Sequence, residues 1–165
     1  MINIIGSCVV GIVIGSALGV MVMNTRNKVE KKVMEEIKKN NSILRQWLIY
    51  KQSGVGIDTI LKENNIKTVA IYGMGEMGRN IIRDLYDSDI IIKYGIDRNK
   101  IGEFCKVNVK KLCECKEKPD LVINSIIRTP DKSVIEKKVK EKLGCRVVSL
   151  DELIFNYVFP KNQNI

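Results

Sequence analysis

Three glycines, Gly73, Gly75 and Gly78, stand at G-x-G-x-x-G spacing directly after an apolar run. Between a strand and a helix, the first glycine of this spacing permits a tight turn. The second lets a pyrophosphate approach the backbone, and the third lets the helix pack closely on the strand. The N–H groups at the start of the helix also attract an anion. The predicted cofactor-binding segment is Gly73, Met74, Gly75, Glu76, Met77 and Gly78.

A carboxylate follows this segment at the distance expected of a ribose-binding residue. Asp97 closes the next apolar run, about 20 residues beyond the glycines, where the acidic residue of a dinucleotide site belongs. Arg98 stands beside it and suits a 2′-phosphate, so the sequence does not separate NAD from NADP. The alternative for Asp97 is a turn or cap residue at the end of a strand.

Polar residues also follow the third apolar run of the predicted domain. Asn124 and Ser125 close that run, and Arg128 lies shortly after them. Ligands of open α/β sheets bind outside the carboxyl ends of the strands, so we expect Asn124 and Ser125 to line the ligand side. An ordinary polar loop is the alternative.

No catalytic constellation or metal site is evident. The chain has no histidine, which removes the commonest general base and the commonest zinc ligand. Cys113 and Cys115, with Cys105, lack the usual zinc spacing, and the odd total of five cysteines favours reduced thiols over a disulfide framework. The catalytic residues are therefore unknown, whether the protein is an enzyme stays open, and no metal is predicted.

The elements that must position these residues alternate between strands and helices. The strands are predicted at residues 68–72, 90–96, 121–125 and 146–150, and the main helices at 76–86, 131–143 and 151–157. Residues 108–115 are predicted as a short helix or an irregular link. Continuous apolar strands that alternate with helices indicate a parallel sheet covered on both faces. We expect a small α/β, Rossmann-like domain of about four strands in the order 3-2-1-4. A single nucleotide or nucleotide-sugar suits this size at least as well as a whole NAD.

The amino-terminal segment reads as a membrane anchor. Residues 2–23 carry no charge and are long enough to cross a hydrocarbon core of about 30 Å as a helix. A cleaved signal peptide is the alternative, but the segment begins without Lys or Arg and no clear cleavage site follows it. The basic residues that follow it place the C-terminal domain in the cytoplasm of a single-pass membrane protein.

Two further features accompany the predicted anchor. Small residues recur every four positions, which favours close helix contact and a homodimer: Ser7, Gly11, Gly15 and Gly19. Residues 25–45 form a charged juxtamembrane helix or stalk, which Asn40, Asn41 and Ser42 are expected to interrupt. The predicted domains are thus an anchor at 1–24, the stalk at 25–45, and a Rossmann-like nucleotide-binding domain at 46–165.

The net charge of +9 and the pI of about 9.3 suit phosphate ligands, an anionic membrane surface or nucleic acid. Aromatic residues make up only 5% of the chain, and no readout motif is visible, so nucleic acid is not an expected partner.

About two thirds of the chain resembles a family of Rossmann-like domains from bacterial polysaccharide and nucleotide-sugar pathways. The residues that carry the resemblance lie in the segments 47–61, 66–78, 94–98 and 148–154. The resemblance implies an NAD(P) or nucleotide-sugar site in an accessory or regulatory protein of glycan biosynthesis. It also implies a glycosyltransferase or another biosynthetic enzyme as partner.

The sequence is therefore compatible with three functions. The first is a membrane-anchored module that binds a nucleotide or nucleotide-sugar. The second is an NAD(P)-dependent oxidoreductase, or a subunit of one, which needs a substrate domain and an acid–base group that the sequence does not display. The third is a structural adaptor that binds no ligand.

Overall fold

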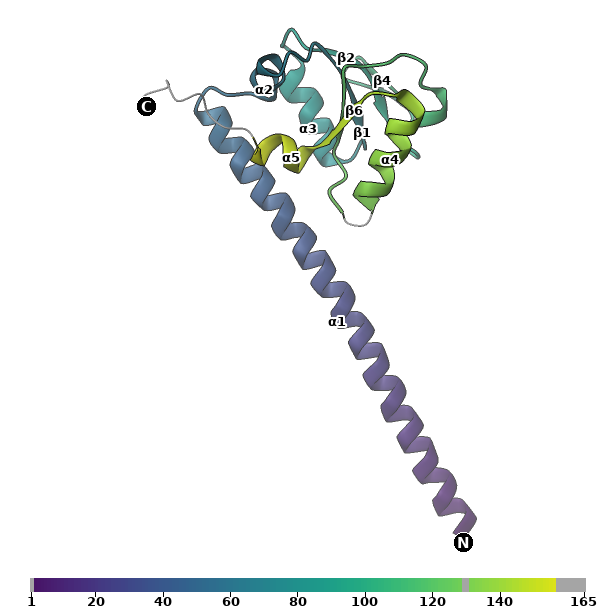
Figure 1. Cartoon of the computed structure of the whole chain (residues 1–165). Coiled ribbons are helices and arrows are strands. Elements are labelled where there is room, and N and C mark those ends of the chain that lie inside the picture. Colours follow the sequence, from purple (N-terminus) through teal and green to yellow (C-terminus); the bar gives the residue numbers. More distant parts are fainter. Residues whose placement is uncertain (1, 129–130, 157–165) are drawn as a thin grey trace. The chain divides into compact units, whose positions relative to one another are not determined.

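The computed structural model describes residues 2–128 and 131–156, with side chains from Met21 onward. The chain divides into two compact units, Met1–Lys39 and Asn40–Ile165. The second unit contains the sheet and all of the predicted site residues, and Figure 1 shows its helices packed around the sheet.

Helix α1 (Ile2–Gln52) runs without a break through residues 40–42, so the predicted interruption there is wrong. Asn and Ser lower helix propensity by less than about 1 kcal/mol each, which packing easily overrides. The packing is provided by Ile43, Trp47 and Tyr50, which are buried in the core of the second unit. The Tyr50 hydroxyl also donates a hydrogen bond to the carbonyl of Ile154 at 3.0 Å.

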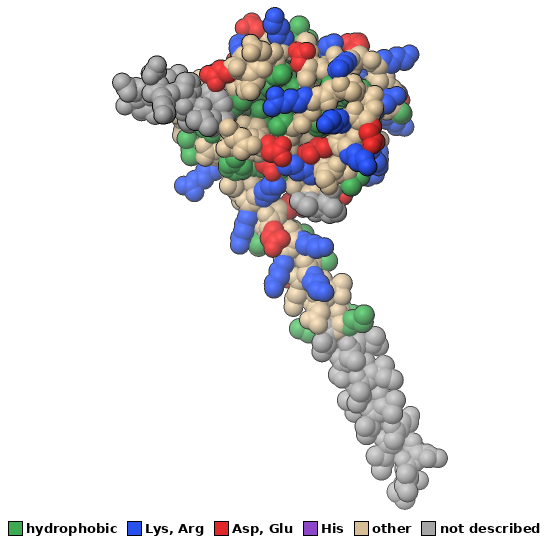
Figure 2. Space-filling view, in the orientation of Figure 1, with side chains coloured by type: hydrophobic (Ala, Val, Ile, Leu, Met, Phe, Trp, Pro, Cys, Tyr) green, Lys and Arg blue, Asp and Glu red, His purple; other side chains and the backbone are tan. Residues whose placement is uncertain are grey.

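The predicted transmembrane helix is contradicted. Among the residues that the structure describes, no helix combines the length and the apolar character needed to cross a membrane. From Met21 onward α1 is rich in charge, and Figure 2 shows Lys and Arg side chains along this part. This finding overturns the anchor and, with it, the predicted single-pass membrane localisation with a cytoplasmic domain.

Most of the segment predicted as an anchor carries side chains that lie outside the described part. This includes the small residues on which the predicted homodimer depends: Ser7, Gly11, Gly15 and Gly19. That contact between two copies remains a prediction.

The second unit contains one mixed, mostly parallel sheet. Its strands are β1 (Thr68–Tyr72), β2 (Ile91–Ile96), β3 (Gly102–Phe104), β4 (Val107–Lys110), β5 (Leu121–Asn124) and β6 (Arg146–Ser149), in the order β3-β4-β2-β1-β5-β6. Only β3 and β4 pair antiparallel. The sheet therefore has six strands, and the prediction of about four is wrong.

The missed strands β3 and β4 form a hairpin whose turn carries no glycine or asparagine signal. Cys105 and Lys106 occupy the turn with φ of 49° and 62°, a backbone conformation for which Gly, Asn and Asp are the usual residues. Because β4 takes the place beside β2, the third predicted strand, β5, pairs with β1 instead. The predicted order 3-2-1-4 is therefore wrong.

Helices cover both faces of the sheet (Figure 1). On one face, α2 (Ile57–Glu63), α3 (Glu76–Leu85), α5 (Leu150–Phe155) and the end of α1 pack on strand residues such as Ile71 and Ile123. On the other face, α4 (Asp131–Leu143) packs on Ala70 and Val122 through Val139. Successive strand residues point to opposite faces, so continuous apolar strands supply both layers.

Candidate nucleotide site at the glycine loop

The loop between β1 and α3 is built around Gly73. Its φ of +91° lies in the left-handed region that glycine adopts without strain. A Cβ at this position would lie 2.7 Å from Ser125 Oγ and 2.8 Å from a side-chain carbon of Ile126. The Gly73 N–H donates to the carbonyl of Ile96 at 2.8 Å, so the loop is joined to β2 as well as to β5. Both the turn and the close packing therefore require glycine here.

The other two glycines meet different requirements. A Cβ on Gly78 would lie 1.9 Å from the carbonyl oxygen of Gly73, so only glycine allows α3 to approach the loop this closely. A Cβ on Gly75 would meet nothing within 4 Å, because the space in front of it is open. The three glycines thus serve as turn, open position and packing contact, in the order that a phosphate-binding loop demands.

Helix α3 begins at this loop without a side-chain cap. Its N-cap residue is Gly75, and no side-chain hydrogen bond caps the first turn. Glu76 is exposed on that turn, whereas Met74 and Met77 are buried in the core. The first N–H groups of an α-helix have no partner within the helix and carry a partial positive charge. This end of α3 is therefore suited to an anion.

Asp97 supports the glycine loop directly. Its Oδ2 accepts a hydrogen bond from the Met74 N–H at 2.7 Å, and its Oδ1 accepts bonds from the N–H groups of Asn99 and Lys100 at 2.9 and 3.0 Å. Partial burial on its own would raise the pKa of Asp97. The N–H groups of Asn99, Met74 and Lys100 outweigh it, with help from the Lys100 charge, and the pKa lies below its usual value. Asp97 is thus ionised at neutral pH, and Oδ2 keeps room for one more hydrogen bond.

Two basic residues lie beside this carboxylate. Arg98 is exposed, and the Lys100 ammonium donates a hydrogen bond to the carbonyl of Met74 at 3.2 Å. Arg98 was predicted from the sequence, whereas no sequence signal pointed to Lys100. The loop after β2 therefore bonds both backbone polar groups of Met74, the N–H through Asp97 and the carbonyl through Lys100. Lys100 also brings a positive charge to the glycine loop.

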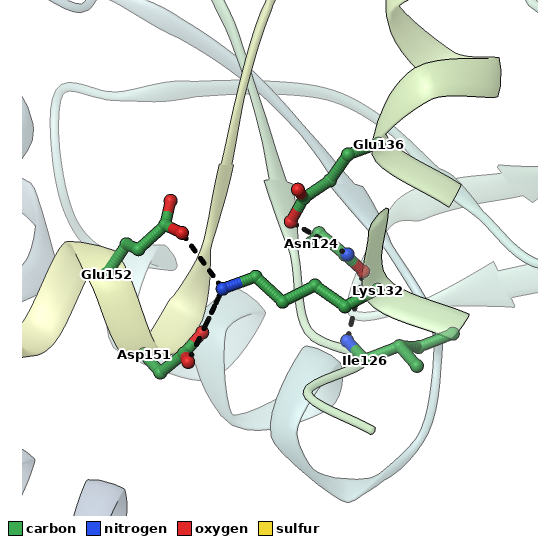
Figure 3. Close-up of polar contacts among 6 residues, drawn as sticks. All are labelled: Asn124, Ile126, Lys132, Glu136, Asp151 and Glu152. Carbon is green, nitrogen blue, oxygen red and sulfur yellow. Dashed lines mark hydrogen bonds and ion pairs between the residues drawn. The ribbon is translucent and has the colours of Figure 1, made fainter. Parts of the chain in front are cut away.

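Asn124 and Ser125 are engaged within the protein. The Ser125 hydroxyl donates to the carbonyl of Gly73 at 2.8 Å. Asn124 is fully buried: its Oδ1 accepts from the Ile126 N–H at 3.0 Å, and its Nδ2 lies 3.4 Å from Glu136 Oε1 (Figure 3). Both side chains lie at the carboxyl edge of the sheet, as expected. In this structure they hold the ends of β5 and α4 in place.

A lysine between two carboxylates lies at the same edge and was missed from the sequence. Figure 3 shows Lys132, from the first turn of α4, reaching Asp151 at 3.2 Å and Glu152 at 2.9 Å on the first turn of α5. Partial burial lowers the pKa of Lys132, but the two carboxylates outweigh it and the pKa is raised. Lys132 lies on α4 and the two carboxylates on α5, 19 and 20 residues farther along the chain, so no local spacing reveals the cluster.

The described residues form neither a metal site nor an activated thiol. Within the described ranges 2–128 and 131–156, no group of three or more His, Cys, Asp or Glu side chains is arranged to hold a metal ion. Cys105 and Cys113 are exposed free thiols, and Cys115 and Cys145 are buried ones. Burial raises the pKa of both Cys115 and Cys145, so neither is an activated thiolate.

A groove of about 480 Å³ lies elsewhere on this unit. It runs between α2, β6 and α5, and its lining includes Leu61, Ile66, Arg146, Val148 and Leu153. Ile66 precedes β1 and Arg146 begins β6, so the groove includes the amino ends of these strands. Ligands of parallel sheets bind at the opposite, carboxyl edge, where the glycine loop lies.

Comparisons with known proteins found no matching family model, curated protein or solved structure. The resemblance to Rossmann-like domains of polysaccharide pathways, and the predicted role in glycan biosynthesis, therefore gain no support beyond the sequence. What is established is an α/β domain whose glycine loop, Asp97 and Ser125 meet at the carboxyl edge of a mostly parallel sheet.

Proposed function

We propose that the second unit binds the phosphate of a nucleotide or nucleotide-sugar at the loop of residues 73–78. The proposal rests on the different structural requirements at the three glycines. Gly73 needs a positive φ, Gly78 needs room against a carbonyl, and Gly75 faces open space beside an uncapped helix start. Folding requires glycine at Gly73 and Gly78 but leaves room for a side chain at Gly75, where glycine is only one of several favoured N-cap residues. Approach of a phosphate to the backbone favours glycine there in particular.

The test is calorimetric titration of the full chain with NAD, NADP, a UDP-sugar and a GDP-sugar. Binding of at least one of them is expected, and Gly75→Val should abolish it while the thermal unfolding curve stays cooperative. Arg45→Ala, on an exposed position of α1, serves as a control that should leave affinity unchanged. The proposal would be rejected if the wild-type chain bound none of the four ligands, or if Gly75→Val bound them with full affinity.

A second candidate, a structural adaptor that binds no nucleotide, is favoured by one observation. Asp97, the residue expected to hold a ribose, already accepts three backbone hydrogen bonds from its own chain. An adaptor would keep this arrangement for loop stability alone. The same titrations separate the two candidates, because an adaptor should bind none of the nucleotides.

A further inference from the structure

We propose that α1 pairs in parallel with the α1 helix of a second copy of this chain, through an exposed apolar stripe in the first unit. The α1 stripe consists of Val22, Val29, Val33 and Ile37. This inference concerns an interaction surface. It does not depend on the proposed nucleotide site, which lies in the second unit.

The α1 stripe occupies one side of the helix. Its residues follow one another at intervals of seven, four and four, which at about 3.6 residues per turn confines them to an arc of about 80°. All four side chains are exposed, from 46% for Ile37 to 67% for Val22. A row of exposed apolar residues on an otherwise charged helix is typical of a surface that packs on another protein.

The part of α1 that carries the stripe receives little support from the described residues. Every side chain from Met21 to Glu35 is exposed, so none of them is packed in a core. An isolated helix of about 12–15 residues is marginal in water, because helices in proteins gain most of their stability by packing an apolar face. The exposed ion pair of Arg26 and Glu30 adds little to this. A partner that covers the stripe supplies the packing.

The order of residues along this face favours a second α1 as the partner. Val22 and Val29 are seven residues apart, and β-branched residues at such a repeated position favour parallel two-stranded pairing. Toward the amino end, the positions of Gly11, Gly15 and Gly19 fall within the same arc of about 80°. Glycine lets two helices approach closely, whereas valine holds them farther apart. In a parallel pair of identical helices, glycines meet glycines and valines meet valines.

One charged residue, Arg26, falls within the arc of the stripe between Val22 and Ile37. Its Nε atom pairs with Glu30 at 3.0 Å, so its charge is compensated within its own helix. A single polar residue in a helix seam sets the register of the two chains at a cost in stability. Arg26 is therefore compatible with pairing, and its replacement by an apolar residue should strengthen the pair.

The test measures the mass of the full chain by sedimentation equilibrium over a range of concentrations. The wild-type chain should dimerise, and the double variant Val33→Gln, Ile37→Gln should dimerise at least about tenfold more weakly, because each dimer loses four buried branched side chains. Glutamine favours a helix more than valine or isoleucine does, so the helix is retained. The matched control is Lys31→Gln, Glu35→Gln, on the opposite side of α1 and likewise without a change in net charge. It should change dimerisation less than threefold, and Arg26→Leu should strengthen it severalfold.

Disulfide cross-linking tests the parallel orientation, in a background in which Cys8, Cys105 and Cys113 are replaced by Ser. Val33→Cys should cross-link two copies, because equivalent residues of a parallel pair lie side by side, whereas Lys31→Cys should not. The inference is overturned if the wild-type chain is monomeric at every concentration, or if the control double variant weakens dimerisation as much as the stripe double variant. It is also overturned if Lys31→Cys cross-links as fast as Val33→Cys, or if Arg26→Leu weakens the dimer.

Discussion

The carboxylate of Asp97 holds the backbone N–H of Met74 at 2.7 Å, although 23 residues separate them. This hydrogen bond joins the loop after β2 to the turn after β1. The residue predicted to bind a ribose therefore also sets the shape of the glycine loop. Under the proposed function, one side chain both supports this loop and contacts the ligand.

Replacing Asp97 by Ala should lower the free energy of unfolding by about 1–3 kcal/mol, because the buried Met74 N–H loses its acceptor. Denaturant unfolding of the full chain measures this loss. Asp89→Ala is the control, since the Asp89 side chain is 92% exposed. Equal stability of the two variants would show that the Asp97 bond contributes nothing.

Acid should weaken the same contact. The pKa of Asp97 is lower in the folded chain than in the unfolded chain, so its contribution to stability is complete above the unfolded pKa of about 3.9. The contribution is lost as pH falls through the lower, folded pKa. The difference in stability between wild type and Asp97→Asn should therefore be constant from pH 5 to 7 and shrink below about pH 4. A difference that grows with acidity would contradict this assignment.

Gly75 and Gly78 should differ in how much stability a methyl group costs. Gly78→Ala places Cβ against the Gly73 carbonyl and should destabilise the unit by about 1–3 kcal/mol or more, the usual cost of overpacking. Gly75→Ala meets open space and should cost no more than about 1 kcal/mol, the scale of a change at a helix N-cap. Thermal unfolding of the two variants provides the comparison. Similar melting temperatures would mean that α3 moves to relieve the clash.

Asp84 connects three helices and should be sensitive to substitution. Its side chain is 6% exposed and accepts hydrogen bonds from Trp47 Nε1 and the Ile57 N–H, both at 3.1 Å, and pairs with Lys51. Asp84→Ala should cost at least about 2 kcal/mol, because two part-buried donors lose their acceptor. Trp47 is the only tryptophan, so its fluorescence reports the change directly. Asp87→Ala, on an exposed neighbour, should leave both the emission and the stability unchanged.

Alkali should release the contact between α4 and α5. The pKa of Lys132 is raised in the folded chain, so its stabilising effect is complete below the unfolded pKa of about 10.4 and is lost as pH rises through the folded pKa. The stability of wild type relative to Lys132→Met should therefore fall only above about pH 10. A decline already complete at pH 8 would point to another group.

Local signals in the sequence were sufficient for several elements. The predicted bounds of the first strand, 68–72, and of the helix at 131–143 are those of β1 and α4. The apolar run of the strand and the spacing of Ile135 and Val139 are properties of a short window, which is where sequence patterns are most informative, although Val134, also predicted to face inward, is 50% exposed. The G-x-G-x-x-G spacing likewise located the turn at Gly73.

Contacts between distant segments were beyond these signals. The hairpin at Cys105 and Lys106 has no typical turn residues, so β3 and β4 were missed and β5 was placed beside the wrong strand. The bond from Asp97 to Met74 and the pairing of Lys132 with Asp151 depend on which loops meet at one edge of the sheet. No periodicity within a single segment encodes such a meeting.

The hydrogen bond from Tyr50 to Ile154 spans 104 residues and ties the end of α1 to α5. During synthesis, Tyr50 is translated long before its acceptor, and Ile43 and Trp47 are translated before the rest of the core that buries them. Contacts of this sequence separation slow folding, because the intervening loop must close first. The end of α1 can therefore complete its contacts with the domain only after α5 has been translated.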